Sequence, residues 1–166
     1  MDCASSRRPR RKPCEAGYTA GMDLSTTVPR SAKDKLLGLV SLKRTIDKAK
    51  AYNDEQLGEY HYDCPHDKPV FAFLGTDAQT FAEQVGLLQR DDAIARWIER
   101  EFLAKKTPAE IDAFNDERMH WHPDPGTPSE HFFLAERRRL GRDDITTWFD
   151  LLDLDEGRPV PHATAV

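Results

Sequence analysis

Apolar residues recur every three or four positions along most of this chain, which is the spacing of an amphipathic helix. No series of segments alternates apolar and polar residues as half-buried strands do, so a parallel sheet with crossover helices is not expected. The pattern predicts an all-α fold, a single compact domain of six or seven helices. A long central helix, followed by an ordered loop, is its expected framework.

The first expected helix runs from about residue 32 to residue 52. Ser31 can cap its start, and one stripe of apolar positions lines its buried face. That stripe is formed by Leu36, Leu39, Val40, Ile46 and Ala49. We expect this helix to be the longest and to cross the core. Residues 53–69 follow as an irregular stretch, because a glycine and two prolines interrupt them.

The middle of the chain is expected to contain a short apolar turn and two helices. The turn Val70–Leu74 ends at Gly75, which suits the position after a helix end. Asp77 can cap the first helix, and either Asp91 or Asp92 can cap the second.

The clearest helix starts are two Thr-Pro-x-Glu sequences, at residues 107–110 and 127–130. Each has the residues of a capping box, with proline at the first helical position. Residues 120–126 between the two helices are expected to form a loop. Gly141 ends the second of them, and one of the two aspartates that follow can cap a final short helix. Residues 145–148 also have strand propensity.

Composition narrows the class of protein. The 166 residues suit one domain, and 39% hydrophobic residues with 32% charged residues are typical of a water-soluble chain. No apolar run is long enough to span a bilayer. Three cysteines are too few for a disulfide scaffold, and no apolar region follows the N-terminal arginines as a signal peptide requires. We expect a cytoplasmic protein without membrane contact.

Charge divides the chain into three parts. Residues 1–21 carry a net charge of +3, which leaves −8 for residues 22–166. We expect residues 1–21 to be a disordered basic tail, residues 22–158 the helical domain, and residues 159–166 a frayed C-terminal tail. The tail could contact nucleic acid or anionic lipid, or it could be dispensable, since the sequence from Met22 looks like a natural N-terminus. The acidic domain argues against nucleic acid as a partner.

Residues 58–67 hold the densest set of reactive side chains, with one thiol, two imidazoles, two phenols and three carboxylates. In an acid–base or nucleophilic mechanism, His61 would be the general base or acid, and Tyr60 or Tyr62 would position the substrate. Cys64 could be the nucleophile, and Cys64 or Asp67 could assist.

Other interpretations of these residues stay open. A metal could be bound by His61, Cys64, His66 and Asp67, with a second half from His120, His122, Asp124 and His131. Only one cluster is evident, so no metal ligand is predicted. The Cys-Pro pair is too short to indicate haem. The same residues could also pack under the loop with a purely structural role. The cofactor is left undetermined.

Basic residues elsewhere could hold an acidic small molecule. Arg44, Lys48 and Arg137 are candidate clamps for its anionic group. The arginines near residue 140 are otherwise expected to form a solvated surface with neighbouring acidic residues. The aromatic residues Trp97, Trp121 and Trp148 are expected to lie in the core.

Several motifs together resemble a bacterial family of proteins known as domain of unknown function 5069. They are Asp23-Leu24, Pro29-Arg30-Ser31, Ile46–Tyr52, Leu57–Tyr62, Cys64-Pro65, Phe73-Leu74-Gly75 and Asp144–Asp153. The similarity extends from about Asp23 to Arg158. It implies a small bacterial protein and supplies neither an activity nor catalytic residues. Two classes of function remain: a small-molecule enzyme without an organic cofactor, or a non-catalytic binding or regulatory module that uses the same loop.

Overall fold

The computed structural model describes residues 21–162, which contain seven α-helices and no named strand. The predicted all-α fold is therefore confirmed. In chain order the elements are α1 (Leu42–Asn53), α2 (Lys68–Leu74), α3 (Ala78–Leu88), α4 (Asp91–Glu101), the 3₁₀ turn η1 (Leu103–Lys105), α5 (Pro108–Met119), α6 (Pro128–Arg139) and α7 (Trp148–Asp155).

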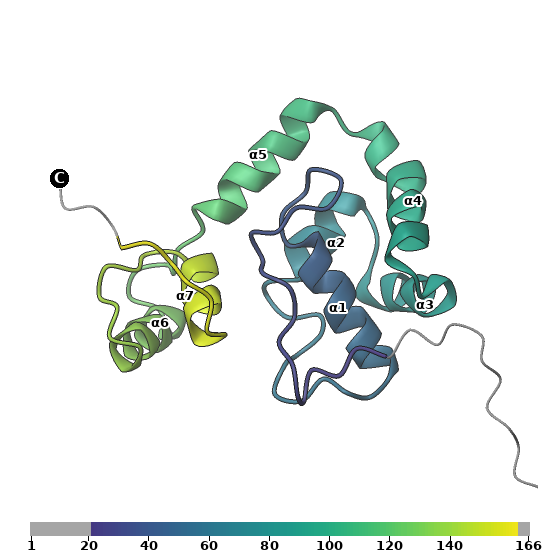
Figure 1. Ribbon diagram of the computed structural model, residues 1–166. Helices are drawn as coiled ribbons and strands as arrows, with labels where there is room; N and C mark the ends of the chain where they lie inside the picture. The colour runs from purple at the N-terminus through teal and green to yellow at the C-terminus, as the bar shows by residue number, and fades with distance from the viewer. Residues whose placement is uncertain (1–20, 163–166) are drawn as a thin grey trace, which may run out of the picture.

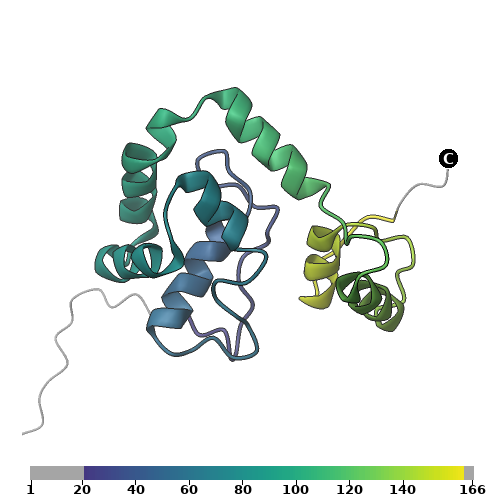
Figure 2. The ribbon, with the colours of Figure 1, turned by 180° about the vertical axis from the view of Figure 1, so that it is seen from behind.

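The helices form two lobes that α5 connects (Figure 1). The N-lobe, residues 21–107, contains α1 to α4, and the C-lobe, residues 120–162, contains α6 and α7. The same arrangement is seen from behind in Figure 2. Phe149 of α7 belongs to the apolar cluster of the N-lobe, so the two lobes are packed against each other.

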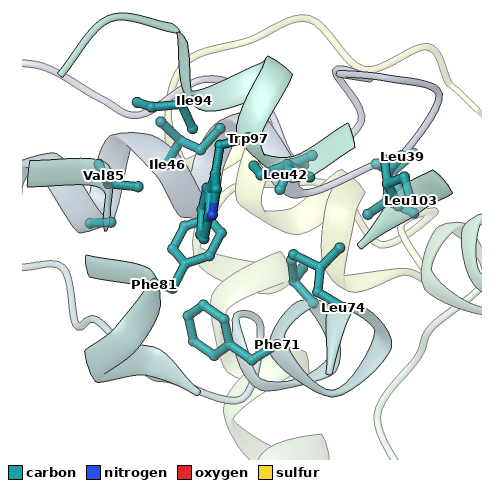
Figure 3. Close-up of a cluster of buried hydrophobic side chains, with 14 of the residues drawn as sticks. Leu39, Leu42, Ile46, Phe71, Leu74, Phe81, Val85, Ile94, Trp97 and Leu103 are labelled. Carbon is teal, nitrogen blue, oxygen red and sulfur yellow. The ribbon is translucent and has the colours of Figure 1, made fainter. Parts of the chain in front are cut away.

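The main core surrounds α1 and α3 (Figure 3). Leu42 and Ile46 of α1 are fully buried against Phe81 and Val85 of α3. A second, smaller cluster holds the C-lobe together through Phe133, Ile145, Trp148, Leu151 and Val160. Of the three tryptophans expected in the core, Trp97 and Trp148 are buried and Trp121 is half-buried.

The expected helix from residue 32 to residue 52 is wrong at its start. Residues 31–41 form turns, and α1 begins only at Leu42. Three residues there have positive φ: Leu37 at 53°, Gly38 at 80° and Ser41 at 67°. A right-handed helix cannot continue through such positions. With 12 residues, α1 equals α5 and α6 in length, so the expected long central helix is absent among the described residues.

Several predicted helix ends are confirmed. The Asp77 carboxylate accepts a hydrogen bond from Thr80 N, and Thr107 forms a complete capping box with Glu110. Gly75 has a φ of 79° after α2, as its expected position requires.

Three other helix starts differ in detail. Thr127 caps α6, but the side chain of Glu130 accepts from Gly126 N instead of closing the box. The N-cap of α4 is Arg90, because Asp91 is already helical. Thr147, rather than an aspartate, caps α7, and no strand forms at residues 145–148.

The structure describes only part of the two expected tails. Residues 1–20 and 163–166 lie outside the described residues. Val160 is buried in the C-lobe, and its carbonyl accepts a hydrogen bond from Arg142. Among the helices that the structure describes, none is long and apolar enough to cross a bilayer.

Candidate functional site

The segment of residues 58–67 is a series of turns that Asp67 ties to α1. Lys48 Nζ donates to Asp67 Oδ2 at 2.5 Å, and both side chains are almost fully buried. The same carboxylate accepts from Thr45 Oγ1 and from Cys64 N, each at 3.3 Å. Thr45 and Lys48 are three residues apart and share one face of α1. This buried ion pair therefore fixes the end of the segment against the helix.

Cys64 lies at the edge of this ion pair. Lys48 Nζ is 3.1 Å from Cys64 Sγ, so one ammonium group contacts both the thiol and the Asp67 carboxylate. Cys64 is a free, half-buried thiol. Of the predicted catalytic residues, Cys64 and Asp67 are thus brought together, and Lys48 joins them.

Tyr60 lies beside a second ion pair, formed by Arg44 and Glu156, on the same side of α1. Arg44 binds Glu156 through two hydrogen bonds, at 2.6 and 2.9 Å, and lies over the Tyr60 ring at 5.6 Å. Burial raises the pKa of Tyr60 to about 12, and the charge of Glu156 adds to the effect. The phenol therefore stays protonated near neutral pH.

His61 and Tyr62 do not join this group. His61 is exposed, and no hydrogen bond, ion pair or ring contact links it to another described residue. The Tyr62 hydroxyl donates to Ala78 O at 2.8 Å, and its ring packs on Tyr52 and Phe71. Burial raises the pKa of Tyr62. The surroundings of Tyr62 are those of a packing residue.

The three candidate anion clamps already have partners in the protein. Arg44 is bound to Glu156, and Lys48 to Asp67. Arg137 lies in the C-lobe, where it donates to Ile145 O at 3.1 Å. It takes no part in the cluster around residues 58–67.

His66 packs against two tryptophans of the C-lobe, a position that its sequence neighbours do not indicate. Its ring lies 4.8 Å from the Trp121 ring and 5.9 Å from the Trp148 ring, measured between centroids. Burial lowers the pKa of His66 to about 3, and the charges of Arg44, Lys48 and Arg118 lower it further. His66 is therefore neutral at physiological pH. It lies where the two lobes meet.

Arg118 was missed by sequence reasoning. Its guanidinium lies 3.9 Å from the centre of the Trp121 ring, and only 4% of the residue is exposed. Burial lowers its pKa. The available signal was its position on α5, one turn after the apolar residue Phe114 and therefore on the buried face.

Neither a metal site nor the surface cavity described here involves the predicted catalytic residues within residues 21–162. Within residues 21–162, no three His, Cys, Asp or Glu side chains gather as a metal site would require. A surface cavity of about 760 Å³ lies beside the C-terminal end of α1, lined by Lys50, Asn53 and Asp91 among others. None of the predicted site residues lines it.

No curated protein matches this chain. Residues 26–158, most of the chain and nearly all of the described part, match the family described as Domain of unknown function (DUF5069). The resemblance seen in the motifs is thereby confirmed, and the chain belongs to the DUF5069 family.

Proposed function

We propose that the protein is a small-molecule enzyme whose reacting group is the Cys64 thiol. The observation that carries the proposal is the contact of Lys48 Nζ with Cys64 Sγ at 3.1 Å. Thiolate is the nucleophilic form of cysteine, and a neighbouring cation favours that form. Asp67 holds the ammonium group in place, and Cys64 is only half-buried. The thiolate would add to a carbonyl carbon of the substrate, and as the new C–S bond forms the carbonyl π bond breaks and its electron pair moves to the oxygen.

The other predicted site residues receive different roles in this proposal. Lys48 changes from a substrate clamp to the cation beside the nucleophile. Asp67 positions Lys48, and Tyr60 lines the same side of α1 as a protonated phenol. His61 has no role here, because nothing in its surroundings directs its ring to the thiol. We further infer a bacterial, cytoplasmic protein, as the free thiol suits a reducing compartment.

Alkylation of the full-length protein by iodoacetamide tests the proposal, with each cysteine quantified by peptide mass spectrometry. Cys3 and Cys14 of the same chain serve as internal references. We expect Cys64 to react about tenfold faster than either at pH 7, because Lys48 Nζ lies 3.1 Å from its sulfur and a contact of this kind activates a cysteine nucleophile. Equal or slower reaction of Cys64 would contradict the proposal.

Two variants isolate the role of the cation. Lys48→Arg keeps the positive charge and should keep most of the rate. The double variant K48M/D67L removes the cation together with its carboxylate, so that neither charge is left buried and unpaired. Its Cys64 should react at the rate of the reference cysteines.

A non-catalytic binding module is the second candidate function. It is favoured by the contacts of Tyr62 and Asp67, which hold the fold together rather than face a substrate. A Cys64→Ala variant separates the two functions once a ligand is found. A binding module keeps full affinity and has no turnover to lose, whereas the enzyme loses turnover.

A further inference from the structure

The buried polar atoms without a partner are concentrated in three residues. Within residues 21–162, the buried side-chain nitrogen and oxygen atoms that make no hydrogen bond are Ser41 Oγ, His66 Nδ1, Arg118 Nε and Arg118 Nη2. Ser41 and Arg118 are only 3% and 4% exposed. Buried polar groups in folded proteins are nearly always satisfied, because leaving them unpaired costs free energy. Such atoms therefore call for an explanation.

Ser41 and Arg118 come from two elements that meet where α5 crosses the N-lobe. Asn115 of α5 accepts from Val40 N at 3.0 Å and donates to Gly38 O at 2.7 Å. These bonds hold α5 against the segment that ends at Ser41, and Arg118 follows Asn115 by three residues on the same face.

His66 is linked to Arg118 through Trp121, and to the start of α1 through Asp67. Its ring contacts Trp121, which also contacts the Arg118 guanidinium and the Trp148 ring. Its neighbour Asp67 accepts from Thr45, which lies one turn along α1 from Ser41. Ser41 is the N-cap residue of α1, yet its side chain caps nothing.

Around this junction, buried basic side chains outnumber the buried carboxylates that pair with them. Arg44 and Lys48 are each matched by a buried carboxylate, Glu156 and Asp67. Arg118 makes no ion pair with any described residue, and the only acidic side chain that favours its charged form is its exposed neighbour Glu117. One buried positive charge is left over. An unpaired buried cation is strongly unfavourable unless an anion compensates it.

The two unpartnered nitrogens of Arg118 form one edge of the guanidinium. In this protein the same edge binds carboxylates elsewhere: Arg30 holds Asp47 through Nε and Nη2 at 2.9 and 2.6 Å. Arg142 holds Asp144 in the same way, at 2.7 and 2.8 Å. Two parallel N–H donors match two oxygens of a carboxylate or phosphate.

We propose that Arg118, His66 and Ser41 form a binding site for a small oxyanion, a phosphate or carboxylate group, at the junction of the two lobes. Arg118 donates two hydrogen bonds from its free edge, and the Ser41 hydroxyl and a His66 Nδ1–H donate the others. The site goes beyond the thiol chemistry proposed for Cys64 and does not depend on it, because it uses none of the same atoms.

Thermal unfolding of the full-length protein, followed by isothermal titration calorimetry, tests this site. The probes are inorganic phosphate, sulfate and acetate, each compared with chloride at equal ionic strength. We expect a saturable rise in unfolding temperature with at least one of them, since ligands of the folded state stabilise it. A preference for phosphate would indicate a phosphorylated ligand, and a preference for acetate would indicate a carboxylate ligand.

Three variants show whether the response belongs to Arg118. Arg118→Met should abolish it, whereas Arg118→Lys, which keeps the charge without the fork, should weaken affinity by about tenfold, the equivalent of one charge-assisted hydrogen bond. Arg138→Gln is the matched control, because Arg138 is exposed on α6 and its loss changes the net charge equally. It should respond as the wild type does.

Two results would overturn the proposal. One is an unfolding temperature that no oxyanion raises more than chloride does, which would mean that water or the Trp121 ring satisfies Arg118. The other is a response of Arg118→Lys and Ser41→Ala identical to that of the wild type. Alkylation of Cys64 is measured on the same samples. An intact Cys64 rate beside a lost anion response separates this site from the thiol proposal.

Discussion

At the scale of single residues, His66 shows how burial sets the chemistry of a side chain. It packs against two tryptophan rings that also contact each other, with Arg44, Lys48 and Arg118 as the charged groups that face it. Both its burial and these charges oppose protonation, so its pKa falls from 6.5 to about 3. Protonation of His66 must therefore be coupled to unfolding.

We expect the free energy of unfolding to decrease on acidification because of His66. The unfolded chain binds a proton below pH 6.5 and the folded protein only near pH 3, so stability falls as the pH falls through this window. The slope is about 1.4 kcal/mol per pH unit for one proton, or roughly 2 kcal/mol between pH 6.5 and 5. Urea denaturation at several pH values measures it.

Two substitutions assign this slope. His66→Phe, which keeps an aromatic ring against the two tryptophans, should remove it. His61→Gln changes an exposed histidine of the same segment and should retain the full pH dependence. If His66→Phe keeps the wild-type slope, another group is responsible.

The buried pair of Lys48 and Asp67 gives a second prediction at this scale. Lys48→Met alone leaves the Asp67 carboxylate buried and unpaired, and should cost about 3–5 kcal/mol of unfolding free energy. K48M/D67L removes both charges and should recover most of that loss. Denaturant titrations of the wild type, the single variant and the double variant measure the difference. A double variant no more stable than Lys48→Met would show that the hydrogen bonds of Asp67 matter more than its charge.

At the scale of elements, the start of α1 shows the limit of sequence patterns. Residues 36–42 have apolar spacing compatible with a helix, and Ser31 before them suits an N-cap, which together predict a start at residue 32. Tertiary contacts override it: Leu36 and Leu39 pair their backbones across a tight turn, and Asn115 of α5 binds that turn. Starts encoded locally, such as the Thr107 capping box, were predictable because all their partners lie within four residues.

The candidate site divides in the same way. The segment of residues 58–67 stands out by composition, and so does the thiol within it. The residues that surround this segment could not be foreseen. Tyr60 packs on Arg44, and Arg44 binds Glu156, which is 112 positions away in the sequence. Arg118 is a single arginine on an amphipathic helix. Its significance comes from the lack of a carboxylate that pairs with it among the described residues, which only the assembled fold reveals.

The contact of α5 with the turn before α1 can be tested by Asn115→Ala. This change leaves the buried Val40 N–H and Gly38 carbonyl without a partner, and should cost about 1–3 kcal/mol. Asp112→Ala, at an exposed position of the same helix, should change stability by less than about 0.5 kcal/mol. Chemical denaturation compares the two. Equal costs would mean that helix propensity, rather than the contact, sets the stability.

At the scale of the whole molecule, polar contacts tie the two lobes together. Ser31 donates to Asp153 at 2.7 Å, and Lys33 binds Asp150 at 2.5 Å. Arg158 binds both Glu156 and the Pro29 carbonyl. The C-lobe has a small apolar cluster of its own, and an assembly of that size rarely buries enough surface to be stable alone. Its stability therefore depends on the N-lobe.

Glu156→Gln tests this dependence, because Glu156 links α7 to Arg44 of α1. Loss of its charge leaves the Arg44 guanidinium buried without a counter-charge, a cost of about 3–5 kcal/mol. The C-lobe should open locally before the N-lobe unfolds, so amide hydrogen exchange in α6 should speed up by about a hundredfold or more, while α3 keeps its protection. Asp155→Asn removes an exposed ion pair with Arg139 and should leave both helices unchanged. An equal loss of protection in α3 and α6 would instead mean that the lobes unfold as one cooperative unit, with Glu156 as important to the N-lobe as to the helix that carries it.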